Sequence, residues 1–183
     1  MIVGLIILGV VFLLFVGMYN SLIKLKNNVK KSFSGIDVQL KRRTDLIPNL
    51  INTVKGYASH EKELLESLTK ARTSIINGSA SGNVNAMAEG ENMLSGALKS
   101  IFAVAENYPD LKANQNFLEL QESLEETEDQ IAAARRIYNE NVNYLNTKIE
   151  VFPSNIIAGM FGFQQADLYT ITESDRGNIE VKF

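Results

Sequence analysis

The sequence predicts an all-α protein: one N-terminal transmembrane helix, then a long antiparallel three-helix bundle (up, down, up), a short C-terminal helix and an irregular tail. Two observations predict this fold: a long uncharged apolar run at the start of the chain, and apolar residues that recur in alternating steps of three and four. With 45% hydrophobic residues among 183, the chain can bury a core. The expected division is an anchor (1–23), a basic juxtamembrane stalk (24–48), the bundle (49–163) and the tail (164–183).

The predicted anchor is the segment 1–23, which has no charged side chain and is almost wholly apolar from Ile2 to Met18. A helix needs about 20 residues to cross the hydrocarbon core of a bilayer. A cleaved signal peptide would have a basic stretch before the apolar run and a small-residue cleavage site after it, and neither is present. The segment is therefore expected to remain as a single-pass anchor.

Amphipathic and basic residues follow the apolar run, as is typical of a membrane exit point: Tyr19, Asn20, Lys24, Lys26, Lys30 and Lys31. This asymmetry of positive charge predicts that the N-terminus lies outside and the C-terminal domain in the cytoplasm.

A heptad pattern runs from residue 29 to residue 75 and predicts one long first helix, continuous with the anchor. A loop is expected at 77–83, with Asn83 or Ser81 capping a second helix that ends before Pro109. A third helix runs to Pro153. For residues 154–163 the sequence predicts a short helix folded onto the bundle, and for the end of the tail a short strand.

Pro48 interrupts the first heptad without changing its phase. It removes the helical bond to the Thr44 carbonyl, and the Thr44 hydroxyl can bond the backbone instead. A helix that is kinked at Thr44 and Pro48 but continuous is favoured over a break. This stretch is expected to be the junction of stalk and bundle, and the first place to look for a binding partner.

Charged residues occupy interior slots of the heptads, where a charge without a partner is costly. Glu91, Arg135 and Arg72 are expected to converge if the third helix runs parallel to the first, and Glu61 would then meet Lys99 or Gln121. Arg43 could reach Asp110. The candidate buried polar or interaction residues are Arg43, Glu61, Arg72, Glu91 and Arg135.

Few catalytic chemistries fit this composition. The sequence has no cysteine and one histidine, His60, interpreted as a surface residue, and it contains no Glu-x-x-His motif for a di-iron bundle. No catalytic residue, cofactor or metal is expected. Residues 24–55 carry a local excess of six positive charges and residues 106–150 an excess of six negative ones. With little aromatic interleaving, these indicate solvated faces of opposite sign and no nucleic-acid site.

Two segments, 19–72 and 134–163, resemble the LemA family of bacterial membrane-anchored proteins. The pairing of RRxDLIPNL at 42–50 with RxYNxxVxxYNxxIxxFP at 136–153 carries the resemblance. One departure is that a leucine separates Tyr144 from Asn146. The resemblance implies a membrane helix followed by a cytoplasmic-facing helical bundle without established catalytic activity, magnetosome-associated relatives, and frequent gene neighbourhood with a membrane metallopeptidase.

The leading functional prediction is a non-enzymatic, membrane-anchored scaffold or adaptor that presents its bundle to a membrane or cytoplasmic protein. The surplus of apolar heptad slots also allows a homo-oligomer. Two alternatives are open: a regulator of a membrane metallopeptidase, and a membrane-shaping assembly protein.

Overall fold

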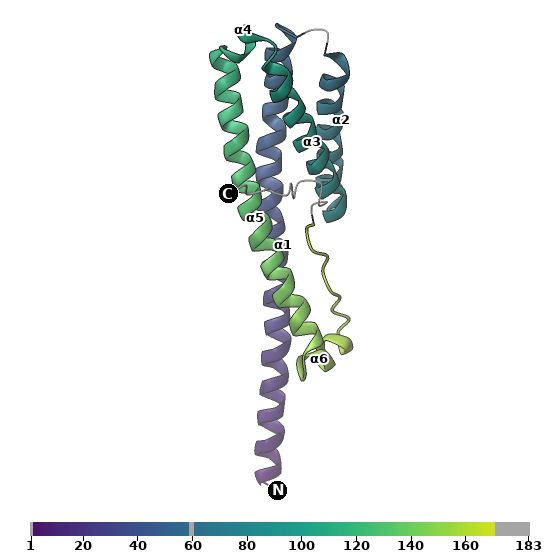
Figure 1. Ribbon diagram of the computed structural model, residues 1–183. Coiled ribbons are helices and arrows are strands. Elements are labelled where there is room, and N and C mark those ends of the chain that lie inside the picture. The colour runs from purple at the N-terminus through teal and green to yellow at the C-terminus, as the bar shows by residue number, and fades with distance from the viewer. Residues whose placement is uncertain (1, 59–60, 171–183) are drawn as a thin grey trace, which may run out of the picture. The chain divides into compact units, whose positions relative to one another are not determined.

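The computed structural model describes residues 2–58 and 61–170 and confirms the all-α prediction, since these ranges contain helices and no strand (Figure 1). The helices are α1 (Ile2–Lys55), α2 (Lys62–Ser81), α3 (Val84–Ala105), α4 (Pro109–Lys112), α5 (Gln115–Glu150) and α6 (Ser154–Met160). The chain forms two compact units, one of residues 1–36 with 132–168, the other of residues 37–131 with the chain from Tyr169. We call them the anchor unit and the bundle unit. The domain boundaries expected at residues 23, 48 and 163 stay predictions.

α1 begins in the apolar run and continues without a break past Pro48 to Lys55, as the sequence predicted. Within the described residues, it is the one helix long and apolar enough to span a membrane. Its large apolar side chains from Ile2 to Leu14 are exposed. Such exposure suits a helix surrounded by lipid, so this segment has the length and composition of a membrane anchor.

The predicted first helix is wrong beyond Lys55, because two helices replace it. A turn follows α1, in which the Tyr57 and Ala58 N–H groups both donate to the Val54 carbonyl, and α2 begins at Lys62. The apolar period survives this break because α1 and α2 face the same core: Leu50 and Val54 are buried before it, Leu65 and Leu68 after it. His60 lies outside the described residues.

In the described part of the bundle unit there are therefore four long helical segments, which run up, down, up and down, in place of the predicted three (Figure 1). Asp37 contacts Ser79 and Thr44 contacts Arg72, so α1 and α2 are antiparallel. The ring centroids of Phe102 in α3 and Phe117 in α5 lie 6.1 Å apart.

α5 runs antiparallel to α1, and the parallel orientation expected for the third helix is wrong. Arg42 of α1 contacts Glu126 of α5, and Tyr57, beyond the end of α1, accepts a hydrogen bond from Asn114, just before α5. Because α2 is a separate helix, α5 is the fourth long helix of the bundle and not the third, and its direction is therefore opposite to the one predicted.

The connection between α2 and α3 is shorter than the predicted loop, because α2 continues to Ser81. Gly82 adopts the left-handed φ of 64°. Asn83, one of the two residues predicted to cap α3, does so by accepting a hydrogen bond from the Ala86 N–H, whereas Ser81 is the last residue of α2. The small residues of the predicted loop, 77–83, instead allow α2 and α3 to pack closely in the hairpin shown in Figure 1. A Cβ on Gly78 would lie 2.8 Å from the Met87 nitrogen.

The same close approach recurs one turn further along the hairpin. A Cβ on Gly90 of α3 would lie 2.9 Å from the Ile75 nitrogen of α2. Real Cβ atoms do not approach backbone this closely, so both positions exclude a side chain unless the helices move apart.

In the anchor unit, α6 packs against α1 and α5, which confirms a short helix over part of 154–163. Ile157 and Ala158 of α6 form a buried cluster with Leu22 of α1 and Leu145 of α5. An extended segment, 163–168, follows α6. The strand expected near the end of the tail lies outside the described residues.

Candidate functional site

The most concentrated set of polar contacts in the bundle unit surrounds residues 42–44 of α1. Arg42 forms an exposed ion pair with Glu126 of α5, at 3.2 Å. Arg43 is 4% exposed; its guanidinium lies 2.5 Å from a carboxylate oxygen of Glu128 and donates to the Ser95 hydroxyl of α3 at 3.3 Å. The arginine thus occupies the interior slot that its heptad position assigns, and its partners come from two other helices.

Thr44 and Pro48 join this layer through the backbone. A proline at position 48 has no N–H for the Thr44 carbonyl, which is therefore left without its helical donor. The Nε–H of Arg72 in α2 donates to that carbonyl at 3.0 Å, and the Thr44 hydroxyl donates to the Lys41 carbonyl at 2.9 Å. Arg72 thus replaces the hydrogen bond that the proline removes.

We call these contacts the polar layer: Arg42, Arg43, Thr44, Arg72, Ser95, Glu126 and Glu128. Asp37 extends it one helical turn along α1 by accepting from the Ser79 hydroxyl of α2. At this level α1 bonds to each of the other three long helices. These contacts can form only where the four helices are aligned as observed, which is the register role that buried charged groups have in some proteins.

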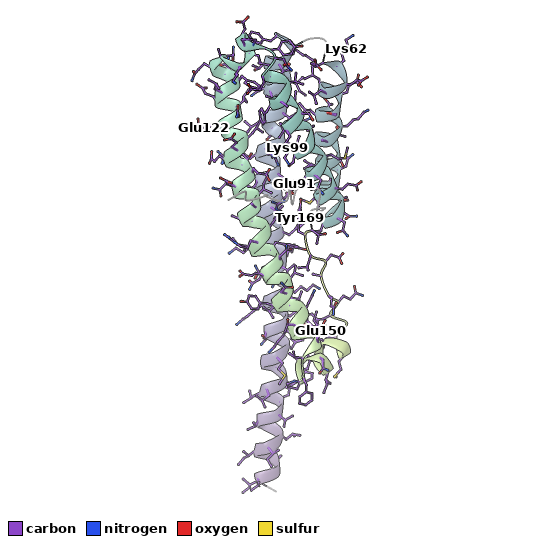
Figure 2. All side chains as sticks on the ribbon, in the orientation of Figure 1. Lys62, Glu91, Lys99, Glu122, Glu150 and Tyr169 are labelled. Atoms are coloured by element: carbon purple, nitrogen blue, oxygen red, sulfur yellow. The ribbon has the colours of Figure 1, made fainter. Side chains whose placement is uncertain are left out.

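Glu91 is 1% exposed and accepts a hydrogen bond of 2.6 Å from the Tyr169 hydroxyl, which comes from the chain beyond α6 (Figure 2). Arg135 is half-buried on the part of α5 that belongs to the anchor unit. The parallel register from which a Glu91–Arg135 pair was derived is wrong, and the pair itself stays a prediction. No sequence pattern singled out Tyr169, because the residues around it have no helical period.

Glu61 is the residue that precedes α2, and it is half-buried. Its carboxylate accepts a hydrogen bond of 3.4 Å from the hydroxyl of Tyr108, the residue before α4. This contact ties the start of α2 to the end of the α3 region.

The second recognisable motif holds the extended segment of the anchor unit against α5. The Asn146 side chain donates to the Ala166 carbonyl and accepts from the Ala166 N–H, both at 2.9 Å. The Tyr138 hydroxyl donates to the Asp167 carbonyl at 2.9 Å, and burial, followed by the nearby Asp167 carboxylate, raises the pKa of Tyr138. These motif residues therefore hold the segment after α6 against α5 through hydrogen bonds. The sequence alone had assigned them no contact.

Two of the juxtamembrane residues of α1, Tyr19 and Lys26, contact aromatic residues that follow α6. Tyr19 is half-buried, with its ring centroid 4.7 Å from that of Phe161, and the Lys26 ammonium lies 6.0 Å from the Phe163 centroid. Asn20, Lys24, Lys30 and Lys31 are exposed.

A polar groove of about 450 Å³ runs between α1 and α5 near the end of α1. Carboxamides and hydroxyls dominate its lining, which includes Asn49, Asn52, Thr53, Asn116, Glu119 and Ser123. Such groups offer both donors and acceptors, so this groove, named the amide groove, can bond a polypeptide backbone.

The polar groups of these sites form contacts between helices or line a surface groove. Within residues 2–58 and 61–170, no group of three or more acidic or histidine side chains is placed to hold a metal ion. The buried charges of the polar layer contact one another or the backbone, and this arrangement supports a structural role.

An apolar membrane-anchor segment, a polar layer inside a helical bundle and a fastened segment after α6 define the class: a membrane-anchor helical-bundle protein. The model of the LemA family matches residues 32–183, so this chain belongs to the LemA family. The family resemblance drawn from the two sequence motifs is thereby confirmed.

Relatives in three bacteria are similar to this chain. The protein LemA of Metamycoplasma hominis is 29% identical over 94% of this chain and 76% of its own length. The magnetosome protein MamQ 2 of Paramagnetospirillum magneticum is 25% identical, and MamQ of Magnetospirillum gryphiswaldense 21%; each match covers 82% of this chain and 64% of the relative. The names of these relatives state no catalytic activity.

Proposed function

We propose that the protein is a non-enzymatic membrane scaffold or adaptor that presents its bundle unit to a protein partner on the cytoplasmic side. The observation that carries the proposal is the continuity of α1, which bears the apolar anchor segment and then one wall of the amide groove. A protein bound in the groove would be held at the membrane through a single helix.

The amide groove is the preferred docking surface because its carboxamides and hydroxyls lie at the surface, whereas the arginines of the polar layer, exposed or buried, already bond to carboxylates, a hydroxyl or the backbone. Asn52 and Glu119 face this groove from α1 and α5. A bound segment would exchange hydrogen bonds with the carboxamides in place of water, and such exchange gives specificity more than affinity.

Photocrosslinking in the native membrane tests the proposal. A photoreactive amino acid at Asn52 or Glu119 of the full chain should capture one protein of defined mass, and the same group at Lys70, exposed on α2, should not. A captured mass equal to this chain would identify the partner as a second copy. The adaptor role is wrong if the groove positions and Lys70 capture the same set of proteins or none.

The orientation has its own test. Because the sequence has no cysteine, a single cysteine at Lys62 of the bundle unit can be labelled in intact cells with a membrane-impermeant maleimide. We expect protection of this cysteine until the cells are lysed, since the basic residues after the anchor favour a cytoplasmic bundle. Labelling in intact cells would reverse the proposed orientation.

The alternatives lead to other measurements. Regulation of a membrane metallopeptidase predicts altered turnover of its substrates in a deletion strain. Membrane shaping by lateral assembly, the other alternative, predicts ordered arrays of the protein on liposomes.

A further inference from the structure

α6 and its flanks carry an apolar surface that the fold leaves uncovered. Phe152, Ile156, Met160 and Phe161 are 79%, 55%, 66% and 50% exposed. We call these four residues the α6 apolar face. The opposite side of α6 already packs through Ile157 on the core of the anchor unit. Soluble surfaces seldom leave bulky apolar side chains clustered in this way, so the face marks a contact with something apolar.

The position of this face along α1 indicates what covers it. The Phe161 ring centroid lies 5.9 Å from that of Phe15 and 4.7 Å from that of Tyr19. Phe15 belongs to the apolar run of α1, and Tyr19 directly follows its last residue, Met18. Phe161 therefore lies level with the end of the anchor segment, where hydrocarbon gives way to lipid headgroups.

The charges that follow this level of α1 support the same occupant. Lys24 and Lys26 follow on α1, as basic groups do beside anionic headgroups.

We propose that α6 is a second membrane-contacting element, whose apolar face enters the boundary between headgroups and acyl chains in the leaflet where α1 leaves the bilayer. The proposal rests on the proposed function in one respect, that α1 spans a membrane. α6 then holds the anchor unit against the lipid surface, in addition to the attachment that the transmembrane part of α1 supplies.

Fluorescence quenching by lipids tests this directly, because the sequence has no cysteine and single labels can be placed at will. The full chain with Met160→Cys or Ile156→Cys, carrying an environment-sensitive fluorophore, is reconstituted in liposomes of zwitterionic and anionic phospholipid. Two sets of spin-labelled lipids are the quenchers: one carries the nitroxide near the headgroup and tests the α6 labels, and the other carries it deep in the acyl chain and tests the Leu8 label. Glu140→Cys, exposed on α5 of the same unit, is the matched control, and Leu8→Cys reports the anchor.

We expect blue-shifted emission at both α6 positions and quenching at least about twofold stronger than at Glu140, since interfacial elements sit roughly 5–10 Å into this boundary. Quenching at Leu8 by deep nitroxides, with α6 labels no more quenched than the Glu140 label, would overturn the inference and leave the anchor intact. A blue shift without lipid quenching that weakens as protein is diluted in lipid would overturn it in favour of a second copy of the chain. Failure of quenching at Leu8 would refute the anchor, and the proposed function with it.

Discussion

Replacing Arg72 by methionine tests whether this side chain compensates for the proline in α1. Methionine keeps an apolar stem but removes the Nε–H that reaches the Thr44 carbonyl at 3.0 Å. Thr44 is 1% exposed, so water has little access to take over the bond. A hydrogen bond from a charged donor contributes about 1.5–3 kcal/mol, and we expect a loss of about 2 kcal/mol in the free energy of unfolding.

The decisive comparison is Arg72→Met in a chain that also carries Pro48→Ala. Alanine restores an N–H at position 48, which can bond the Thr44 carbonyl as in an uninterrupted helix. The carbonyl then has a donor without Arg72, so we expect Arg72→Met to cost at least about 1 kcal/mol less than in the parent chain. The intrinsic effect of removing the proline cancels in the cycle.

Guanidinium unfolding of the full chain in detergent, followed by circular dichroism, measures the four variants of the cycle. Lys70→Met, an exposed change on the same helix, controls for the general effect of methionine in α2. If Arg72→Met costs the same with and without Pro48, then the orphaned carbonyl is not the reason for the position of the arginine, and the compensation argument fails.

Three further predictions follow from single contacts. Gly90→Ala should lower stability by about 1–3 kcal/mol through overpacking. Gly96→Ala on the same helix, where an added Cβ meets no atom within 4 Å, should raise stability by up to about 1 kcal/mol, and equal effects of the two changes in denaturant unfolding would contradict the close packing of α2 and α3. Tyr138 has a raised pKa in the folded protein, so its contribution to stability is fully present below the unfolded pKa of about 10 and is lost as pH rises through the folded pKa. The alkaline decline in melting temperature should therefore be shallower in Tyr138→Phe, and identical slopes in the two proteins would contradict this. Tyr169→Phe removes a donor to the buried Glu91 carboxylate and should lower the free energy of unfolding by about 1.5–3 kcal/mol in the same assay. An unchanged free energy of unfolding would mean that this hydrogen bond contributes nothing to the bundle unit.

Heptad periodicity predicted which faces of the helices are buried but could not count the helices. Leu50, Val54, Leu68 and Ile75 were all assigned to the interior, and all are buried. The turn after Lys55 left the apolar phase unchanged, because both sides of it face one core. Periodicity reports burial, and any helix that keeps its face toward the core preserves it.

The polar residues show the same division. Their interior slots singled out Arg43 and Glu91, both of which lie inside the bundle unit. Their partners, Glu128 and Tyr169, are remote in sequence and carry no local signal. Which side chain meets a buried charge depends on helix direction and register, and a single error in the number of helices changed both for α5.

By itself the sequence determined the all-helical class, the apolar anchor segment, the choice of Asn83 or Ser81 as the cap of α3, and the family, because each depends on local propensity or on motifs that are contiguous in the chain. Only the tertiary structure decided that α1 and α5 run antiparallel, that Arg72 supplies the bond lost at Pro48, and that α6 leaves an apolar face beside the end of the anchor segment. Those features are contacts between segments far apart in the chain, and their free energy exists only once the helices have packed.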